Sequence, residues 1–340
     1  MTAPVLEISG LCKRFRAAGG GVVHAVEDVD LRIGPGEIVG LVGESGSGKS
    51  TVGKCVVRLL EPDDGRITLV GNDITHLSQR RLRPVRGDVH MVFQDPYTSL
   101  NPRATIRAIV AEPLRRKDKL SAAVARRRAA DLIERMGLPG TLIDRYPHEL
   151  SGGQRQRVGI ARSLGLRPKL LIADEPISAL DTSVQASILN QLKELQRELG
   201  FSCLFIAHNL ATVGFLCDRV AVMYLGRIAE QGSCARIFHD PRHPYTRSLL
   251  SAALIADPVA QRRRTKIVLR GEIPSPISPP SGCVFRTRCP VVEDVCATPP
   301  PLVDTDDGGT VRCHFPGRVP AETKQPIIGS AAHHGLPRHV

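Results

Sequence analysis

The sequence has no long apolar run, few aromatic side chains and no internal repeat. No stretch approaches the roughly 18 consecutive apolar residues that a membrane-spanning helix needs, so none is expected. The N-terminal segment contains Glu7, which interrupts the apolar core that a secretory signal requires, and a cytoplasmic protein is therefore expected. Aromatic residues make up only 4% of the chain, so stacking platforms for single-stranded nucleic acid are scarce.

The charge is unbalanced, although the overall composition is ordinary. Hydrophobic residues make up 42% and charged residues 24% of the 340 residues, which is typical of a soluble globular protein with one main domain and an appendage. Lys and Arg number 46 against 34 Asp and Glu, which gives a formal charge of +12. Such an excess favours an anionic partner: a nucleotide, a nucleic acid or an acidic membrane surface.

Apolar runs rich in β-branched residues alternate with helical patterns through the first 230 residues, which indicates an α/β domain with a largely parallel core sheet. Strands are expected at 5–11, 26–33, 38–42, 66–70, 89–93, 170–173, 203–207 and 219–224. Helices are expected at 49–60, 122–136, 154–164, 183–199 and 210–217. The arginine-rich section 103–165 has no strand pattern and is interpreted as a helical insertion.

A glycine-rich loop follows the expected strand 38–42, opens the next helix and fits the pattern G-x-x-x-x-G-K-[ST]. Glycines let the backbone curl so that its N–H groups and the helix N-terminus face phosphate oxygens. We expect Lys49 to reach the β- and γ-phosphates of a nucleotide and the Ser50 hydroxyl to ligate Mg²⁺. The expected nucleotide-binding residues here are Gly43, Glu44, Ser45, Gly46, Ser47, Gly48, Lys49, Ser50 and Thr51.

Two further segments carry chemistry. The apolar run 170–173 ends in Asp174 and Glu175, at the expected carboxyl edge of the sheet. Asp174 can hold Mg²⁺ through its water shell, and Glu175 can orient and activate an attacking water. A glycine-rich segment opens the helix 154–164 and consists of Ser151, Gly152, Gly153 and Gln154. Alone it would suggest a helix cap, but beside a phosphate loop it suggests a second anion site that serves a neighbouring molecule's nucleotide.

The phosphate loop, this helix start and the acidic strand end, in that order, resemble an ABC-type ATPase, whose signature motif matches residues 150–154. Gln94 matches the Q-loop of that family, Asp181 its D-loop and His208 its switch histidine. The resemblance implies that Gln94 touches Mg²⁺ and water and that His208 contacts the γ-phosphate. Phe15 lies where the family places an aromatic side chain that stacks on adenine.

The resemblance covers roughly residues 5–250 and implies both a fold and a mechanism. The expected fold is an ABC-type P-loop ATPase domain with a RecA-like core sheet, an antiparallel β subdomain and a helical subdomain at about 98–165. Two such domains would sandwich two ATP molecules, each bound by the phosphate loop of one domain and the signature of the other. Glu175 would polarise the attacking water, while Lys49, His208 and the opposing signature stabilise the developing charge. Because Glu175 is intact, a non-hydrolysing regulatory module is disfavoured.

The C-terminal segments 243–250, 271–276 and 283–290 resemble the tail of oligopeptide/dipeptide/nickel importer ATPases. This resemblance implies a second ATPase subunit, often a different chain, two membrane permeases that dock on about 94–150, and an extracytoplasmic substrate-binding protein. It places the chain at the cytoplasmic face of the membrane. The expected units are an ATPase domain at 1–255, a small Cys/Pro-rich module at 256–316, separate and loop-rich, and a disordered tail at 317–340.

Four of the nine cysteines crowd into this module: Cys283, Cys289, Cys296 and Cys313. Their spacings of 5, 6 and 16 intervening residues match neither the usual zinc pattern nor the ferredoxin pattern. Four thiolates nevertheless suit a metal, and some members of the resembled subfamily carry an iron–sulfur cluster on this tail. Three alternatives stay open: a [4Fe–4S] cluster, a structural Zn²⁺ or plain reduced thiols.

A soluble ABC ATPase that acts on nucleic acid is the alternative function, because it would also suit the positive charge. Repair and chromosome-maintenance ATPases insert hundreds of residues between phosphate loop and signature, whereas Lys49 and Ser151 are about a hundred residues apart. Translation-associated members normally carry two ATPase domains, and this chain has one. No nucleic-acid partner is therefore expected. Nine arginines are interpreted first as part of solvated helix faces and second as contacts to acidic lipid or to a permease. They are Arg80, Arg81, Arg83, Arg86, Arg115, Arg116, Arg126, Arg127 and Arg128.

Overall fold

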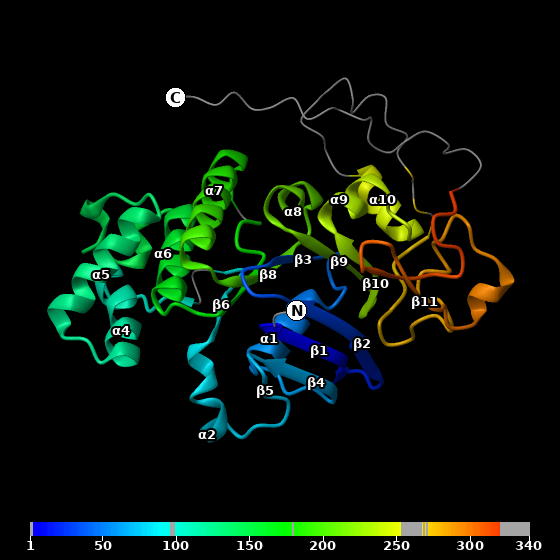
Figure 1. Cartoon of the computed structure of the whole chain (residues 1–340), viewed down its shortest axis with the longest axis horizontal. Helices are drawn as coiled ribbons and strands as arrows, with labels where there is room; N and C mark the ends of the chain where they lie inside the picture. Colours follow the sequence, from blue (N-terminus) through cyan, green and yellow to red (C-terminus); the bar gives the residue numbers. More distant parts are fainter. Residues whose placement is uncertain are drawn as a thin grey trace.

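The computed structural model describes residues 3–95, 99–178, 180–252, 267, 269 and 271–319. Within them, a large sheet and a small sheet enclose one helix, further helices cover the other face of the large sheet, and a group of helices lies at one end (Figure 1). The part of the C-terminal module that contains strand β11 (Leu302–Asp304) lies at the opposite end. Residues 256–266 of the expected module and residues 320–340 of the expected tail lie outside the described residues.

The large sheet of the described residues has eight strands in the order β11-β12-β10-β9-β3-β8-β7-β6. From β9 to β6 all neighbours pair in parallel, as expected for strands that are nearly continuous apolar runs. At the other edge, β10, β12 and β11 continue the sheet in antiparallel pairing. The strands are β3 Ile38–Val42, β6 Val89–Val92, β7 Leu170–Asp174, β8 Ser202–Ala207, β9 Arg219–Tyr224, β10 Arg227–Ser233, β11 Leu302–Asp304 and β12 Thr310–Arg312.

The small sheet is antiparallel throughout and has the order β2-β1-β4-β5. Its inward side chains share one apolar cluster with α1 and with one face of the large sheet. The expected antiparallel β subdomain is this sheet. Its strands are β1 Leu6–Arg16, β2 Val22–Ile33, β4 Asp64–Leu69 and β5 Asn72–Asp73.

The helices form three groups. The first is α1 (Lys49–Val56), which lies between the two sheets. The second covers the other face of the large sheet and comprises α7 Thr182–Leu199, α8 Leu210–Leu216, α9 Cys234–His239 and α10 Pro244–Ala252. The third packs together near β6 and comprises α4 Ile106–Asp118, α5 Ala122–Arg135 and α6 Gly152–Gly165. Short elements are α2 Gln79–Leu82 and 3₁₀ turns at Val85–Gly87, Gly140–Leu142, Pro147–Glu149 and Asp294–Ala297.

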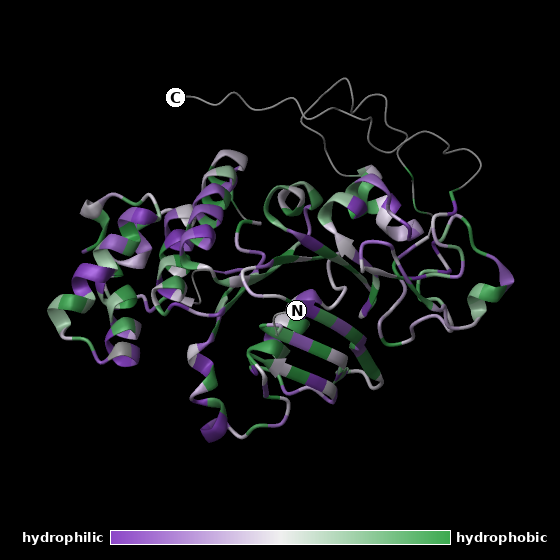
Figure 2. Ribbon diagram, in the orientation of Figure 1, coloured by the Kyte–Doolittle hydropathy of each residue, from purple (hydrophilic) through white to green (hydrophobic). Residues whose placement is uncertain are grey.

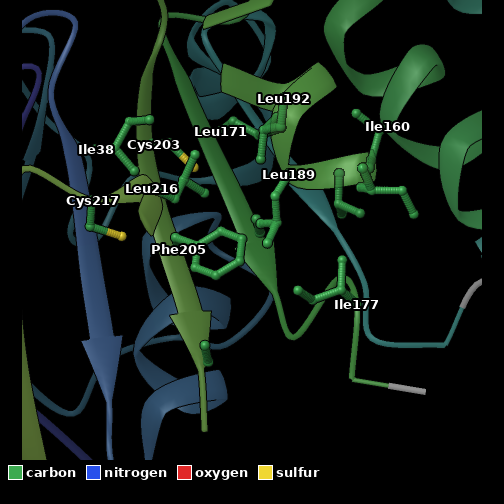
Figure 3. Packing of buried hydrophobic residues seen from close by; sticks show 14 of the residues in the cluster. Ile38, Ile160, Leu171, Ile177, Leu189, Leu192, Cys203, Phe205, Leu216 and Cys217 are labelled. Atoms are coloured by element: carbon green, nitrogen blue, oxygen red, sulfur yellow. The ribbon is translucent and has the colours of Figure 1, made fainter. Parts of the chain in front are cut away.

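The apolar run of β8 is explained by burial on both faces of the sheet. Cys203 and Phe205 point toward Leu189 and Leu192 of α7 (Figure 3). The alternate residue Ile206 belongs to the cluster on the opposite face, beside α1 and the small sheet. In Figure 2 the strands at the centre of the large sheet are mostly hydrophobic, whereas the helices and the strands of the small sheet show both hydrophobic and hydrophilic stretches.

An observed element overlaps each strand and helix expected from the sequence, and the helical insertion holds α4, α5 and α6. The α/β fold class is confirmed. Within the described part of the expected module, 271–316, β12 pairs with β10 and so continues the sheet of the ATPase domain, which differs from the expectation of a separate module. No helix among the described residues is both long and apolar enough to span a membrane.

Candidate nucleotide-binding site

The phosphate loop connects β3 to α1 and lies close to two neighbouring backbones. Gly48 has a φ of +103°, and a Cβ there would lie 2.1 Å from the carbonyl oxygen of Ala25 on β2. A Cβ on Gly43 would lie 2.1 Å from the carbonyl oxygen of Met223 on β9. Both positions therefore require glycine on steric grounds as well as conformational ones.

Lys49 lies inside the curl of this loop and is 4% exposed. Its Nζ donates to the carbonyl oxygens of Gly43 at 2.9 Å and Glu44 at 2.8 Å, and to Ser47 Oγ at 3.3 Å. Burial lowers the pKa of Lys49, and the nearby carboxylate of Glu175 counteracts this effect. The ammonium group is thus held in the loop, where phosphate oxygens would enter.

Asp174 and Ser50 meet beside the loop. The Ser50 hydroxyl donates to Asp174 Oδ1 at 2.7 Å, which joins the start of α1 to the end of β7. Burial raises the pKa of Asp174, and the hydrogen bond from Ser50 lowers it. A hydroxyl and a carboxylate at one point are the hard oxygen ligands that Mg²⁺ prefers, so these two residues fit the expected metal.

Glu175 has a strained backbone and two side-chain neighbours. Its φ is +44°, which is unusual for a residue with a side chain and frequent at functional sites, and its N–H donates to the Ile206 carbonyl at 3.0 Å. Glu175 Oε2 accepts from Gln94 Nε2 at 2.9 Å and lies 3.5 Å from His208 Nδ1. These residues follow the parallel strands β7, β6 and β8, whose carboxyl ends lie at one edge.

The signature residues open α6 as a capping box. Ser151 Oγ accepts from the Gln154 N–H at 3.3 Å, and the Gln154 side chain accepts from the Ser151 N–H at 2.9 Å. A Cβ on Gly153 would lie 2.8 Å from Val184, whereas Gly152 has more room. The helix packs on α4, α5 and β6 and stands apart from α1 in Figure 1, so the chain does not bring its signature to its own phosphate loop.

Two expected site residues, Asp181 and Phe15, lie at the margins of the site. Asp181 is the exposed residue before α7, and its side chain makes no capping hydrogen bond. Ala179, within the expected D-loop, lies outside the described residues, but Ser178 Oγ donates to the Glu175 carbonyl at 3.2 Å. Phe15 lies near the end of β1, is 36% exposed and has Lys13 Nζ 5.5 Å from its ring centre. Its ring is therefore available to a nucleobase.

The four clustered cysteines all belong to the described part of the C-terminal module. Three are buried and Cys289 is half-buried. Burial, together with the charges of the other three thiols, raises the pKa of the Cys289 thiol to about 12. Among the described residues, however, no group of three or more His, Cys, Asp or Glu side chains is placed to hold a metal ion. The [4Fe–4S] or Zn²⁺ site therefore has no support from the geometry and stays a prediction.

Sequence reasoning assigned no role to two residues that contact the phosphate loop. Arg288 Nη1 lies 2.8 Å from Glu44 Oε2, and the Glu44 N–H donates to the Tyr245 hydroxyl at 2.9 Å. Both residues lie inside the C-terminal segments that carry the subfamily resemblance, 283–290 and 243–250. That resemblance was the signal that could have pointed to them.

Comparison with known families and proteins agrees with this geometry. The chain matches the ABC transporter family over residues 26–178 and the oligopeptide/dipeptide transporter C-terminal region over residues 229–296. It is 48% identical to the oligopeptide transport ATP-binding protein OppF of Escherichia coli (strain K12), over 91% of this chain and 95% of that protein. It is 47% identical to the putative oligopeptide transport ATP-binding protein YkfD of Bacillus subtilis (strain 168), over 95% and 98%.

Solved structures share the fold of the ATPase part. The dimeric post-hydrolysis state of the ATP-binding cassette MJ0796 bound to ADP and Pi superposes with a TM-score of 0.63 at 29% identity, covering 67% of this chain and 98% of that one. The cbiO1 protein of Clostridium perfringens, part of the ABC transporter complex cbiONQ, gives 0.62 at 32% identity, covering 70% and 91%. The chain therefore belongs to the family of ABC transporter ATP-binding proteins that carry the oligopeptide/dipeptide transporter C-terminal region.

Proposed function

We propose that this chain is the ATP-hydrolysing motor subunit of a membrane importer for peptides or a similar small solute. The observation that carries the proposal is the convergence of Gln94, Glu175 and His208 at the edge of the sheet where the phosphate loop also begins. The names of the relatives, which describe oligopeptide transport ATP-binding proteins, supply the class of cargo.

Each residue of the site has a role in this function. The loop N–H groups and Lys49 bind the phosphates of ATP. Ser50 and Asp174 would hold Mg²⁺, which neutralises phosphate charge when bound. Glu175 accepts a hydrogen bond from the attacking water and polarises it, and Gln94 holds the carboxylate in place. His208 lies next to Glu175 and would contact the γ-phosphate.

Pairing of two ATPase chains completes the site in this proposal. The signature helix α6 stands apart from the chain's own phosphate loop, so a second chain must supply Ser151, Gly152, Gly153 and Gln154 to each nucleotide. The dimeric solved cassette supports such an arrangement. We propose a partner of the same family, most simply a different subunit of the same importer.

Two permeases would dock on the helical group at the cytoplasmic face of the membrane, and an extracytoplasmic binding protein would deliver the cargo. A groove of about 640 Å³ between α4 and α5 supports this docking. Arg107 in its lining is paired with Asp144, and Arg116 is paired with Glu112. Within the described residues, two further lining arginines, Arg115 and Arg126, have no ion pair and could receive an acidic permease segment.

The experiment that tests the function is reconstitution. The chain, expressed with the permeases, partner ATPase and binding protein encoded beside its gene, is inserted into proteoliposomes. ATP hydrolysis should rise when the binding protein carries a labelled tripeptide, and the label should accumulate only with ATP. The same complex with Glu175→Gln is the control for hydrolysis. An intact complex that hydrolyses ATP but never moves the tripeptide would reject the peptide assignment.

The alternative, a nucleic-acid ATPase, predicts a different result. The relatives and structures named above are described as transport proteins or transporter cassettes. Micromolar or tighter, salt-sensitive binding of DNA or RNA would favour this alternative. Under the importer proposal, we expect no such binding at physiological salt.

The metal prediction for the four cysteines has its own test. The crowding of four cysteines into one short stretch of the sequence supports it, because four thiolates can ligate either metal. Protein purified without oxygen is analysed for iron, acid-labile sulfide and zinc. Four irons per chain with visible absorption support a [4Fe–4S] cluster, and one zinc per chain supports Zn²⁺. If neither metal is found, the four cysteines are plain reduced thiols.

A further inference from the structure

The C-terminal module forms an ion pair with the side chain of one phosphate-loop residue, Glu44. Arg288 Nη1 lies 2.8 Å from Glu44 Oε2, and Nη2 lies 3.3 Å from Oε1, so the guanidinium fork meets the carboxylate with both of its ends. The Arg288 side chain is 9% exposed and that of Glu44 is 24% exposed. This pair joins segments 244 residues apart and is shielded from solvent on the arginine side.

The same loop residue is held a second time through its backbone. The Glu44 N–H donates to the hydroxyl of Tyr245 at 2.9 Å. Tyr245 belongs to α10 and is fully buried, and burial raises the pKa of its hydroxyl, which stays protonated. Both contacts to Glu44 therefore come from the C-terminal part of the chain, one from α10 and one from the loop that carries Arg288.

Three aromatic rings pack together beside these two contacts. The ring centres of Tyr224 and Tyr245 are 4.6 Å apart, and Phe285 lies 5.2 Å from Tyr224 and 5.4 Å from Tyr245. The guanidinium carbon of Arg288 lies 6.0 Å from the Tyr224 ring centre. Because all three rings are buried and the Arg288 side chain is itself only 9% exposed, the packing around Arg288 holds its guanidinium near the carboxylate.

Glu44 stands where a free carboxylate would harm nucleotide binding. Its carbonyl oxygen accepts from Lys49 Nζ at 2.8 Å, so its backbone lies directly beside the phosphate-binding ammonium. An unpaired negative charge here would repel the phosphates and compete for Lys49. Arg288 supplies the compensating positive charge, and Tyr245 fixes the backbone that bears it.

We propose that Arg288 and Tyr245 are positioning residues for ATP binding: through Glu44 they fix and neutralise the phosphate loop, so that the C-terminal module sets the affinity of the site. This inference deepens the proposed ATPase function and rests on it. In this proposal the effect of both residues passes through their contacts with Glu44.

The test uses the full chain and ADP that carries a methylanthraniloyl fluorophore. Arg288→Ala should weaken binding of this probe and raise the KM for ATP about tenfold, while kcat changes by less than about threefold, because the reacting groups at Glu175 are intact. Adding Glu44→Gln to Arg288→Ala should restore most of the affinity, since it removes the unpaired charge. Glu44→Gln alone completes the double-mutant cycle.

A matched control separates this effect from simple loss of module structure. Arg318 also belongs to the module and pairs with Glu293, but its side chain is half exposed and makes no contact with the phosphate loop among the described residues. Arg318→Ala should leave probe affinity within about twofold of wild type. An equal loss of affinity in Arg318→Ala and Arg288→Ala would overturn the proposal.

The remaining outcomes of this experiment also test the inference. Unchanged affinity of folded Arg288→Ala, or a loss that Glu44→Gln does not relieve, overturns the inference. If Arg288→Ala fails to fold, Tyr245→Phe tests the inference instead, because it keeps the ring and removes the acceptor of the Glu44 N–H. Tyr245→Phe should weaken probe binding about threefold. Unchanged probe affinity of this variant would overturn the inference. Wild-type chain that binds no probe at all would instead refute the proposed ATPase function.

Discussion

Gln94 donates a hydrogen bond from Nε2 to Glu175 Oε2 at 2.9 Å, which ties the segment after β6 to the end of β7. His208 lies 3.5 Å from the same carboxylate oxygen, after β8. One carboxylate is thus contacted from two neighbouring strand ends. Under the proposed function, a movement of the segment after β6 that breaks the amide contact would loosen Glu175, and so would link permease docking to the reaction.

Glu175→Gln should keep nucleotide binding and reduce phosphate release at least about a hundredfold, because an amide cannot accept the proton of the attacking water. Binding of fluorescent ADP and release of phosphate in the assembled complex measure the two properties separately. Glu194→Gln, an equivalent change at an exposed position of α7, serves as the control. Full phosphate release by Glu175→Gln would disprove the catalytic role.

The parallel core and the phosphate loop were predictable because their physics is local. A strand buried on both faces must be apolar along its length, as in β7 and β8, and glycine is required wherever a Cβ meets backbone, as at Gly48. The order of these segments along the chain then predicted that Asp174 and the phosphate loop meet. The hydrogen bond between Ser50 and Asp174 agrees with that prediction.

The C-terminal part was less predictable because its structure depends on distant partners. β10 reads Arg-Ile-Ala-Glu-Gln-Gly-Ser, and its charged Glu230 is fully buried only because Arg236 and the N–H groups of Arg242 and His243 pair with it. No local pattern predicts such burial. The Arg288 contact with Glu44 is equally non-local, since the two residues are 244 positions apart.

Gly48→Ala should destabilise the loop and weaken nucleotide binding at least tenfold. A Cβ at this position would lie 2.1 Å from the Ala25 carbonyl oxygen, in addition to the cost of about 1–2 kcal/mol for an L-residue in a left-handed conformation. Gly46→Ala is the comparison, because φ is +77° there and no atom lies within 4 Å of the added Cβ. The midpoint temperature of thermal unfolding should therefore fall further for Gly48→Ala than for Gly46→Ala. Equal falls in this temperature would contradict the steric argument.

Ser151→Ala should cost about 1 kcal/mol of stability through the lost N-cap and should also reduce ATP hydrolysis in the paired complex. Ser121→Ala is a close control, because Ser121 caps α5 in the same way, accepting from the Val124 N–H, outside the signature. Chemical denaturation should give similar losses for both variants, whereas steady-state hydrolysis should fall only for Ser151→Ala. A parallel loss of hydrolysis in both would remove the trans-binding role.

Charge reversal in the α4–α5 groove should weaken permease docking. Arg115 and Arg126 line this groove and are exposed, so Arg115→Glu with Arg126→Glu would repel an acidic segment without disturbing a described ion pair. We expect at least a fivefold loss of permeases that co-purify with the chain. Arg197→Glu on the exposed side of α7 is the control. Unchanged co-purification would place the docking surface elsewhere.

Stability should fall as the pH falls below about 6.5, because His243 is buried in its neutral form. Burial lowers its pKa to about 4, although nearby Glu230 acts in the opposite direction, and its Nδ1 accepts from the Tyr245 N–H. An unfolded histidine has a pKa of about 6.5, so between these values the unfolded chain binds more protons and the contribution is lost on acidification.

The free energy of unfolding in urea, measured from pH 7 to pH 5, should therefore decline by up to about 1.4 kcal/mol per pH unit from this group alone. His243→Gln removes the titrating group and should flatten the slope. His148→Gln, at an exposed position in a 3₁₀ turn, should keep the wild-type slope. A wild-type free energy that stays constant over this range would show that His243 takes up its proton as readily in the folded chain as in the unfolded one.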